Sequence, residues 1–224
     1  MHPITIFIHT ALLTGVQERI NLFLEYIEKN GLIEKVETIY ISIVGDCTEQ
    51  LLQIPDKHQD KVKKIHSSPR LTDYELPTLK LLFNHCTTHT NHRVLYLHTK
   101  GVGKEVNPCI EDWIHYMLYF LVEKYEDAIL KLDTYITVGV DLREVPVLHY
   151  SGNFWWANAS FISTLPDPIE FNCLTKYPNP LQSLRHNQEF WICYNKDNHY
   201  SLWDCGINCY ERHLHRYTRD VYCK

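Results

Sequence analysis

Short apolar runs rich in β-branched residues alternate along this chain with segments of helical periodicity. The first run is Ile4–Ile8, and a helical pattern of apolar residues begins near Gln17 and stops at Asn30-Gly31, a typical left-handed helix end. Further strands are expected at these later runs: 35–44, 62–66, 93–97 and 134–140. Such alternation predicts an α/β fold with a mostly parallel central sheet and helices on both faces.

The same periodicity predicts further helices in the second half of each β–α unit. One starts near Pro77 and runs through Cys86, a long one covers 113–129, and a short one covers 157–165. Residues 167–180 carry several prolines and are expected to form a loop. With 224 residues, 45% of them hydrophobic, and no linker or repeat, the chain is expected to be one domain.

Charge and hydropathy exclude several classes of protein. The net charge of −5 disfavours a nucleic-acid partner, which normally requires a basic stripe. The first apolar run has no basic leader, and no apolar span reaches 18 residues, so neither a signal peptide nor a transmembrane segment is expected. These features predict a cytoplasmic protein whose eight cysteines are free thiols. The tail spacing Cys205-x3-Cys209-x3-His213-x-His215 matches no common zinc pattern.

Polar residues follow several of the expected strands. In open α/β sheets the ligand lies beyond the carboxyl ends of the strands, so the polar ends at 9–11, 45–46, 66–73 and 98–103 are expected to meet there. Lys100 can donate to a diphosphate, and Gly101 and Gly103 allow a close approach of the backbone. The alternative is a solvated lysine in a turn.

Two other stretches carry groups suited to chemistry. The segment 149–157 (HYSGNFWWA) offers aromatic faces and hydrogen-bonding groups that suit a sugar, although its aromatics can equally belong to the core. Glu189 lies among aromatic residues that can desolvate it and can serve as a general base. Its alternative role is a helical salt bridge to Arg185, four residues earlier.

These motifs occur in the order Tyr74–Thr78, Tyr96–Gly101, Trp113, His149–Ala157 and Arg185-x3-Glu189-x-Trp191. Together they resemble the small GT-A-fold glycosyltransferase domains of large DNA viruses and some bacteria, over about residues 4–194. The resemblance implies a hexosyltransferase that moves a sugar from a UDP- or GDP-sugar to a glycan hydroxyl in the cytoplasm, which is the host cytoplasm for a viral protein. It also implies a nucleotide-binding half (1–103), an acceptor half (104–194) and a tail (195–224). The alternative is an inactive transferase or a carbohydrate-binding module.

The resemblance also assigns roles to individual residues. Glu189 is the expected base of an inverting reaction, although a retaining one with a carboxylate such as Asp141 on the other face of the sugar stays open. The expected nucleotide and diphosphate ligands are Thr10, Ala11, Asp73, Glu75, His98 and Lys100. The expected sugar and acceptor contacts are His149, Gly152, Asn153, Phe154, Trp155 and Trp156.

The sequence departs from the family at the strand end where most GT-A enzymes carry Asp-x-Asp, because this chain has His98-Thr99-Lys100 there. A Mn²⁺ or Mg²⁺ ion is therefore expected to be held mainly by the donor diphosphate, with Asp73 or Asp141 as the one protein carboxylate. The other expectation is a metal-independent enzyme in which Lys100 supplies the positive charge.

Overall fold

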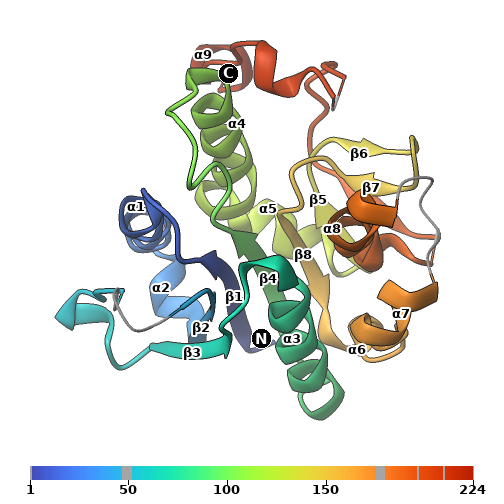
Figure 1. Cartoon of the computed structure of the whole chain (residues 1–224). Helices are drawn as coiled ribbons and strands as arrows, with labels where there is room; N and C mark the ends of the chain where they lie inside the picture. Colours follow the sequence, from blue (N-terminus) through green and yellow to red (C-terminus); the bar gives the residue numbers. More distant parts are fainter. Residues whose placement is uncertain (1, 47–51, 175–179, 196, 209, 224) are drawn as a thin grey trace.

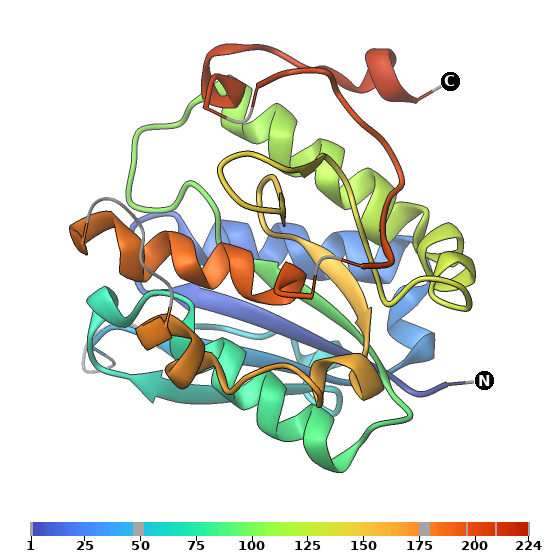
Figure 2. The ribbon, with the colours of Figure 1, turned by 90° about the vertical axis from the view of Figure 1, so that its right-hand side faces the viewer.

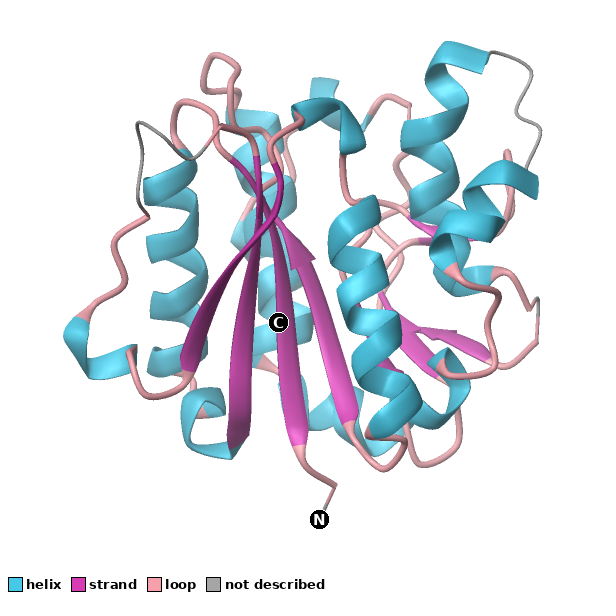
Figure 3. Ribbon diagram, turned by 60° about the horizontal axis from the view of Figure 1, so that its bottom comes forward, coloured by secondary structure: helices cyan, strands magenta, loops and turns pink. Residues whose placement is uncertain are grey.

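The computed structural model describes residues 2–46, 52–174, 180–195, 197–208 and 210–223 (Figure 1). Its central sheet has the strand order β3-β2-β1-β4-β8-β5-β9. The strands of this sheet are β1 (Ile4–Ala11), β2 (Val36–Val44), β3 (Val62–Ser68), β4 (Arg93–His98), β5 (Thr137–Gly139), β8 (Trp155–Asn158) and β9 (His199–Ser201). The first four are parallel to one another, and β8 runs antiparallel to both of its neighbours (Figure 3). The predicted α/β fold with a mostly parallel sheet is confirmed.

Helices cover both faces of this sheet (Figure 2). They are α1 (Val16–Lys29), α2 (Leu32–Lys35), α3 (Leu76–Thr88), α4 (Pro108–Leu118), α5 (Tyr125–Lys131), α6 (Ala159–Ile162), α7 (Pro168–Leu174), α8 (Pro180–Phe190) and α9 (Arg219–Tyr222). A two-stranded ribbon of β6 (Leu142–Arg143) and β7 (His149–Tyr150) lies beside them. In the described part of the chain, no helix has the length and apolar character needed to span a bilayer.

The two faces of the sheet belong to separate hydrophobic clusters. Successive side chains of a strand point to opposite faces, so Ile6 and Ile8 of β1 pack with α1 and α4 while Phe7 between them packs with α3. Strand β8 divides its indoles in the same way, with Trp156 in the first cluster and Trp155 in the second. Both faces of the central strands are therefore buried, as expected for a parallel sheet between helices.

The structure corrects three predicted elements. The helix expected over 113–129 is interrupted by a π-turn, Tyr119–Glu123, because the Lys124 N–H bonds back to the Tyr119 carbonyl at 2.9 Å. The segment expected to be a helix from Ala157 onward starts as strand β8, and only α6 follows it. The expected loop at 167–180 contains α7, whose first turn begins at Pro168 and is capped by Asp167 Oδ1, which accepts the Ile169 N–H at 2.9 Å.

Candidate functional site

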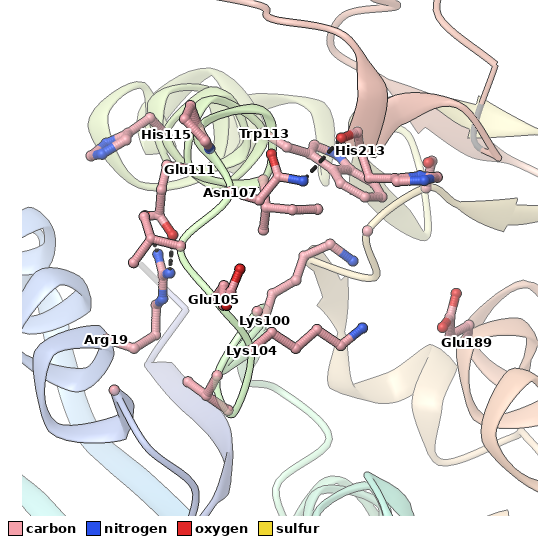
Figure 4. Close-up of a pocket in the computed structure, with 18 of the residues that line it drawn as sticks. Arg19, Lys100, Lys104, Glu105, Asn107, Glu111, Trp113, His115, Glu189 and His213 are labelled. Atoms are coloured by element: carbon pink, nitrogen blue, oxygen red, sulfur yellow. Dashed lines mark hydrogen bonds and ion pairs between the residues drawn. The ribbon is translucent and has the colours of Figure 1, made fainter.

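A large cleft lies where the order of the parallel strands reverses. The chain moves outward from β1 to β2 and β3, and then returns to place β4 on the other side of β1. Crossovers from β1 and β4 therefore leave in opposite directions, and a crevice opens between the carboxyl ends of these strands. A cleft of about 1310 Å³ occupies this position. Its walls come from the start of α1, the loop between β4 and α4, the β6–β7 ribbon, the end of α8 and the C-terminal tail (Figure 4).

The loop after β4 is tied to the chain that follows β1. The Thr99 N–H donates to the His9 carbonyl, and the Gly103 N–H donates to the Thr14 carbonyl, both at 2.9 Å. Gly103 has φ 75°, and a β-carbon there would lie 2.9 Å from Leu13 Cδ1, so the close approach of the two segments requires glycine. This attachment fixes the loop at the edge of the cleft.

Two lysines of this loop extend into the cleft in the same direction, toward the side where Glu189 lies (Figure 4). The Lys100 Nζ lies 3.9 Å from the centre of the Trp113 ring, a cation–π distance. Burial lowers the pKa of Lys100, whereas the nearby carboxylates of Glu189 and Glu75 oppose that shift. Lys104 is exposed to solvent. The loop thus brings two ammonium groups, one of them partly desolvated, to one side of the cleft.

A third cation of the cleft is already neutralised. Arg19, in the first turn of α1, forms a two-pronged ion pair with Glu111 of α4, with N–O distances of 2.5 and 3.0 Å. Asn107 caps α4 through its Oδ1, which accepts the Cys109 N–H at 2.9 Å, and its Nδ2 donates to the His213 carbonyl of the tail at 3.1 Å. These contacts hold α1, α4 and the tail together around the cleft. The other cationic side chains that line it are Lys100 and Lys104 of the loop after β4 and Arg185 of α8.

The carboxylate of Glu189 comes from the last turn of α8 and lines the opposite side of the cleft (Figure 4). The preceding residue fixes this helix end, because Gln188 Oε1 accepts the Glu75 N–H at 2.6 Å and its Nε2 donates to the Asp73 carbonyl at 3.4 Å. Among the described residues, no ion pair joins Glu189 to Arg185. The carboxylate is therefore positioned by its helix and available to a ligand.

A buried hydrogen-bond network lies at the strand ends beneath the cleft. Glu75 Oε2 accepts the Tyr96 hydroxyl at 2.5 Å and the Asn153 amide at 2.7 Å, and Asn153 Oδ1 accepts the Trp155 indole N–H at 2.9 Å. His98 Nε2 donates to a backbone carbonyl, that of Gly152, at 2.9 Å, and burial lowers the pKa of His98 to about 3. Three predicted ligand-binding residues, Glu75, His98 and Asn153, thus have buried structural partners and do not line the cleft.

The other predicted nucleotide ligands also lie away from the cleft. Thr10 is fully buried, and the backbone N–H of Ala11 donates to Thr99 Oγ1 at 3.2 Å. Asp73 accepts the Ser68 hydroxyl at 2.5 Å and pairs with Arg70 at 3.1 Å. Leu12 and Leu71 both approach Gly45 at the end of β2, and none of these residues lines the cleft. The strand ends at 45–46 and 66–73 therefore do not join the 98–103 loop in one crevice, contrary to expectation.

The predicted aromatic platform belongs to the core. Phe154, Trp155 and Trp156 are each at most 1% exposed, and the Trp156 indole N–H donates to the Leu121 carbonyl at 2.8 Å. They cannot stack on a sugar in this structure, because their ring faces are covered by protein. Of the expected sugar contacts, His149 and Gly152 line the cleft.

The two aspartates predicted as metal ligands do not line the cleft either. Asp141 is buried, and its Oδ1 accepts the Cys205 N–H at 2.7 Å and the Arg143 guanidinium at 3.2 Å. Arg143 also binds Asp204 through two hydrogen bonds of 2.6 and 2.7 Å. The group of Asp141, Asp204 and Cys205 thus has carboxylates that already surround a guanidinium. Asp73 and Asp141 do not fit a cation held against a ligand in the cleft.

Several cleft residues were not predicted from the sequence. They are Arg19, Lys104, Glu105, Asn107, Glu111, His115 and His213. Lys104 could have been recognised, because it follows the second glycine of the loop that contains Lys100. The Cys205, Cys209 and His213 motif of the tail is described only in part, because Cys209 lies outside the described residues. The five cysteines whose state is described are free: Cys86, Cys109, Cys193, Cys205 and Cys223.

Comparison with known proteins gives a family and a set of distant structural neighbours. The model of one family, described as a domain of unknown function (DUF8361), matches residues 6–200. A search of curated proteins gave no match. The chain is similar to HddC from Yersinia pseudotuberculosis, with a TM-score of 0.47 and 11% identity over 91% of each chain. It is also similar to 4-diphosphocytidyl-2C-methyl-D-erythritol synthase from Anaerococcus prevotii, with a TM-score of 0.47 and 11% identity over 90% of this chain and 87% of that one.

Proposed function

The chain belongs to the DUF8361 family, and from its cleft we propose that it is a glycosyltransferase that uses a nucleotide-sugar donor. The observation that carries the proposal is the placement of Lys100 and Lys104 opposite Glu189 in one cleft at the strand reversal. The lysines suit the diphosphate of a donor, because ammonium groups form strong charge-assisted hydrogen bonds with phosphate oxygens. The carboxylate suits the proton of an acceptor hydroxyl.

The size of the cleft supports two ligands. Pockets for one small molecule are commonly about 300–1,000 Å³, and this cleft, at about 1310 Å³, is larger. A nucleotide sugar near the loop after β4 leaves room for an acceptor beside α8 and the β6–β7 ribbon. His149 and Arg185 lie on that second side and offer polar contacts for the acceptor.

In the proposed reaction, Glu189 takes the proton of the acceptor hydroxyl as the hydroxyl oxygen attacks the anomeric carbon. The bond from that carbon to the diphosphate oxygen breaks, and its electron pair leaves with the nucleoside diphosphate. Lys100 and Lys104 stabilise the negative charge that develops on this oxygen. The attack comes from the face opposite the leaving group, so the anomeric configuration inverts. Asp141, the expected candidate for a retaining reaction, does not line the cleft.

A divalent ion bound with the donor would polarise the diphosphate in the same way as the lysines. Neither aspartate expected to hold such an ion fits that position, because neither lines the cleft. The proposal instead gives the charge-stabilising role to Lys100 and Lys104. The competing idea of a carbohydrate-binding module loses its main support, because the aromatic platform on which it depended is buried.

The proposal is tested with the purified full-length chain. Nucleoside diphosphates and nucleotide sugars should raise the melting temperature, and a ligand at 100 times its Kd should stabilise by about 2.7 kcal/mol. The nucleotide sugars that bind should then release nucleoside diphosphate in the presence of a glycan acceptor. Binding of free sugars without any affinity for nucleotides would refute the transferase and support a carbohydrate-binding protein.

A further inference from the structure

Three histidines gather at the end of the sheet opposite the cleft. His85 and His89 occupy the last turn of α3 and the position that follows it, and His92 precedes β4. They lie beside Thr5 near the start of β1, whereas the cleft lies beyond the carboxyl ends of β1 and β4. The end of α3 and the start of β1 lie at the same end of the sheet (Figure 3). From this arrangement we propose that His85, His89 and His92 bind a transition-metal ion of the zinc class at a site separate from the cleft.

The spacing of two ring nitrogens supports this site. The distance from His85 Nε2 to His92 Nδ1 is 3.3 Å. Two histidine nitrogens on a tetrahedral zinc ion, each about 2.0–2.1 Å from the metal, lie about 3.3–3.4 Å apart. Thr5 Oγ1 lies 3.4 Å from the first nitrogen and 3.0 Å from the second. Two edges of this triangle, 3.3 and 3.4 Å, match those of a zinc tetrahedron, and the third, the 3.0 Å hydrogen bond between Thr5 and His92, is shorter. A water can replace the hydroxyl at its corner.

The other nitrogen of His92 faces a carboxylate. His92 Nε2 lies 3.9 Å from Glu37 Oε2 of β2. A carboxylate on this side favours the tautomer with the proton on Nε2, which leaves the Nδ1 lone pair directed at His85. Metal-binding histidines commonly have such a carboxylate behind them, because it fixes the ring and makes the ligating nitrogen more basic.

His89 supplies the ligand that the open side of the site requires. Its ring stacks on that of His85 with centres 4.2 Å apart and planes 3° from parallel, and it lies edge-on to His92 at 5.0 Å. His89 is exposed, so rotation about its side-chain bonds can turn a nitrogen toward the other two without disturbing the core. His89 directly follows the last residue of α3, and its Nδ1 donates to the His85 carbonyl at 3.1 Å, which leaves Nε2 as its ligating nitrogen.

The chemistry of the ligands identifies the class of ion. Imidazole nitrogens suit zinc, copper and nickel, whereas magnesium and calcium prefer oxygen ligands. The group of Asp141, Asp204 and Cys205 is less suited to a metal ion, because the Arg143 guanidinium already lies between its two carboxylates.

The test is titration of the full-length chain with Zn²⁺ by calorimetry, and with Co²⁺ by visible absorption. We expect one saturable site, weakened at least about tenfold in His85→Gln and in His89→Gln, since each variant loses one ligand. Glu37→Gln should weaken the site about 10- to 100-fold if the carboxylate supports His92. The matched control is His213→Gln, which alters a histidine of the cleft and should leave zinc affinity unchanged.

The result that overturns the proposal is zinc affinity unchanged in His89→Gln, whose exposed side chain can be replaced without loss of the fold. Loss of binding in His213→Gln with no loss in His89→Gln would place the ion in the cleft instead. If His85→Gln does not fold, His89→Gln and Glu37→Gln decide the question by themselves. Because nucleotide binding is not part of this measurement, its outcome is independent of the proposed transferase activity.

Discussion

Replacing Lys100 with methionine separates the role of this residue in anion binding from its role in the fold. Methionine keeps an apolar stem against the Trp113 ring but removes the ammonium group that lies 3.9 Å from the ring centre. A hydrogen bond to a charged group is worth about 1.5–3 kcal/mol. The Kd of a nucleoside diphosphate should therefore rise roughly 10- to 150-fold. The Kd of the corresponding nucleoside, which has no phosphate, should not change.

The stability of the unliganded protein should respond differently. The variant loses a cation–π contact worth about 0.5–2 kcal/mol. It also escapes the cost of burying a charge, which is what lowers the pKa of Lys100. A lysine with a lowered pKa in the folded state destabilises that state while it is charged, and this cost disappears only as the pH rises above the folded pKa. At neutral pH the two effects oppose each other, so we expect no large change in melting temperature.

Calorimetry with the nucleoside and the nucleoside diphosphate, together with thermal unfolding, measures both effects. The matched control is Lys124→Met, because the Lys124 ammonium also lies over an aromatic ring, that of Tyr119, but does not line the cleft. This control should leave both affinities unchanged. Equal weakening of nucleoside and diphosphate binding by Lys100→Met, or no weakening at all, would refute the placement of the diphosphate beside Lys100.

Three further predictions concern the base, the buried network and pH. Glu189→Gln should keep donor binding and lower kcat by about 10²–10⁴-fold, and an unchanged kcat would remove this residue from the mechanism. Glu75→Ala leaves two buried donors without their acceptor, at about 1–3 kcal/mol each, so urea unfolding should show a loss of about 2–6 kcal/mol; a loss below about 1 kcal/mol would contradict the structural role. Burial lowers the pKa of His9 to about 4 and that of His98 to about 3. As the pH falls below 6.5, these two histidines are therefore protonated in the unfolded chain before they are protonated in the folded protein. Between pH 7 and 5.5 these two residues should lower the unfolding free energy by about 2–3 kcal/mol, and His98→Asn should remove about half of this pH dependence.

Much of the fold could be predicted because local sequence and burial agree in the first half of the chain. The strands β1 and β4 are buried over nearly their whole length and β2 is buried from Ile41 onward, and their β-branched runs have no competing helical pattern. The prediction of one continuous helix over 113–129 was wrong for a different reason. Apolar residues continue at helical spacing through the π-turn, while the break itself depends on the backbone of Lys124, which periodicity does not reveal.

The candidate site was predicted less completely. Lys100 and Glu189 could be identified because each is a reactive type of residue beside an expected strand end or aromatic cluster, and both line the cleft. Thr10 and Asp73 also lie at or after strand ends, but Thr10 is fully buried, Asp73 is bound by Ser68 and Arg70, and neither lines the cleft. Whether a strand end is open or covered depends on loops distant in the sequence, and a strand pattern cannot show which loop folds over it.

The indoles of Trp155 and Trp156 do not line the cleft, although His149 and Gly152 of the same segment do. Trp155 pairs with Tyr96 and Trp156 with Leu95 across adjacent strands, so their side chains must point to opposite faces of the sheet. Both faces are covered by helices, and no rotation could turn both indoles toward one cleft. The antiparallel direction of β8 instead brings the turn at Gly152 to the carboxyl end of β4, where it borders the cleft. Gly152 itself packs on α4, since a β-carbon there would lie 2.5 Å from Met117 Sδ. For the proposed sugar donor, this segment therefore offers His149 and backbone groups of the turn, and any stacking contact must come from other aromatic residues of the cleft, which are Trp113, Phe190 and Tyr210.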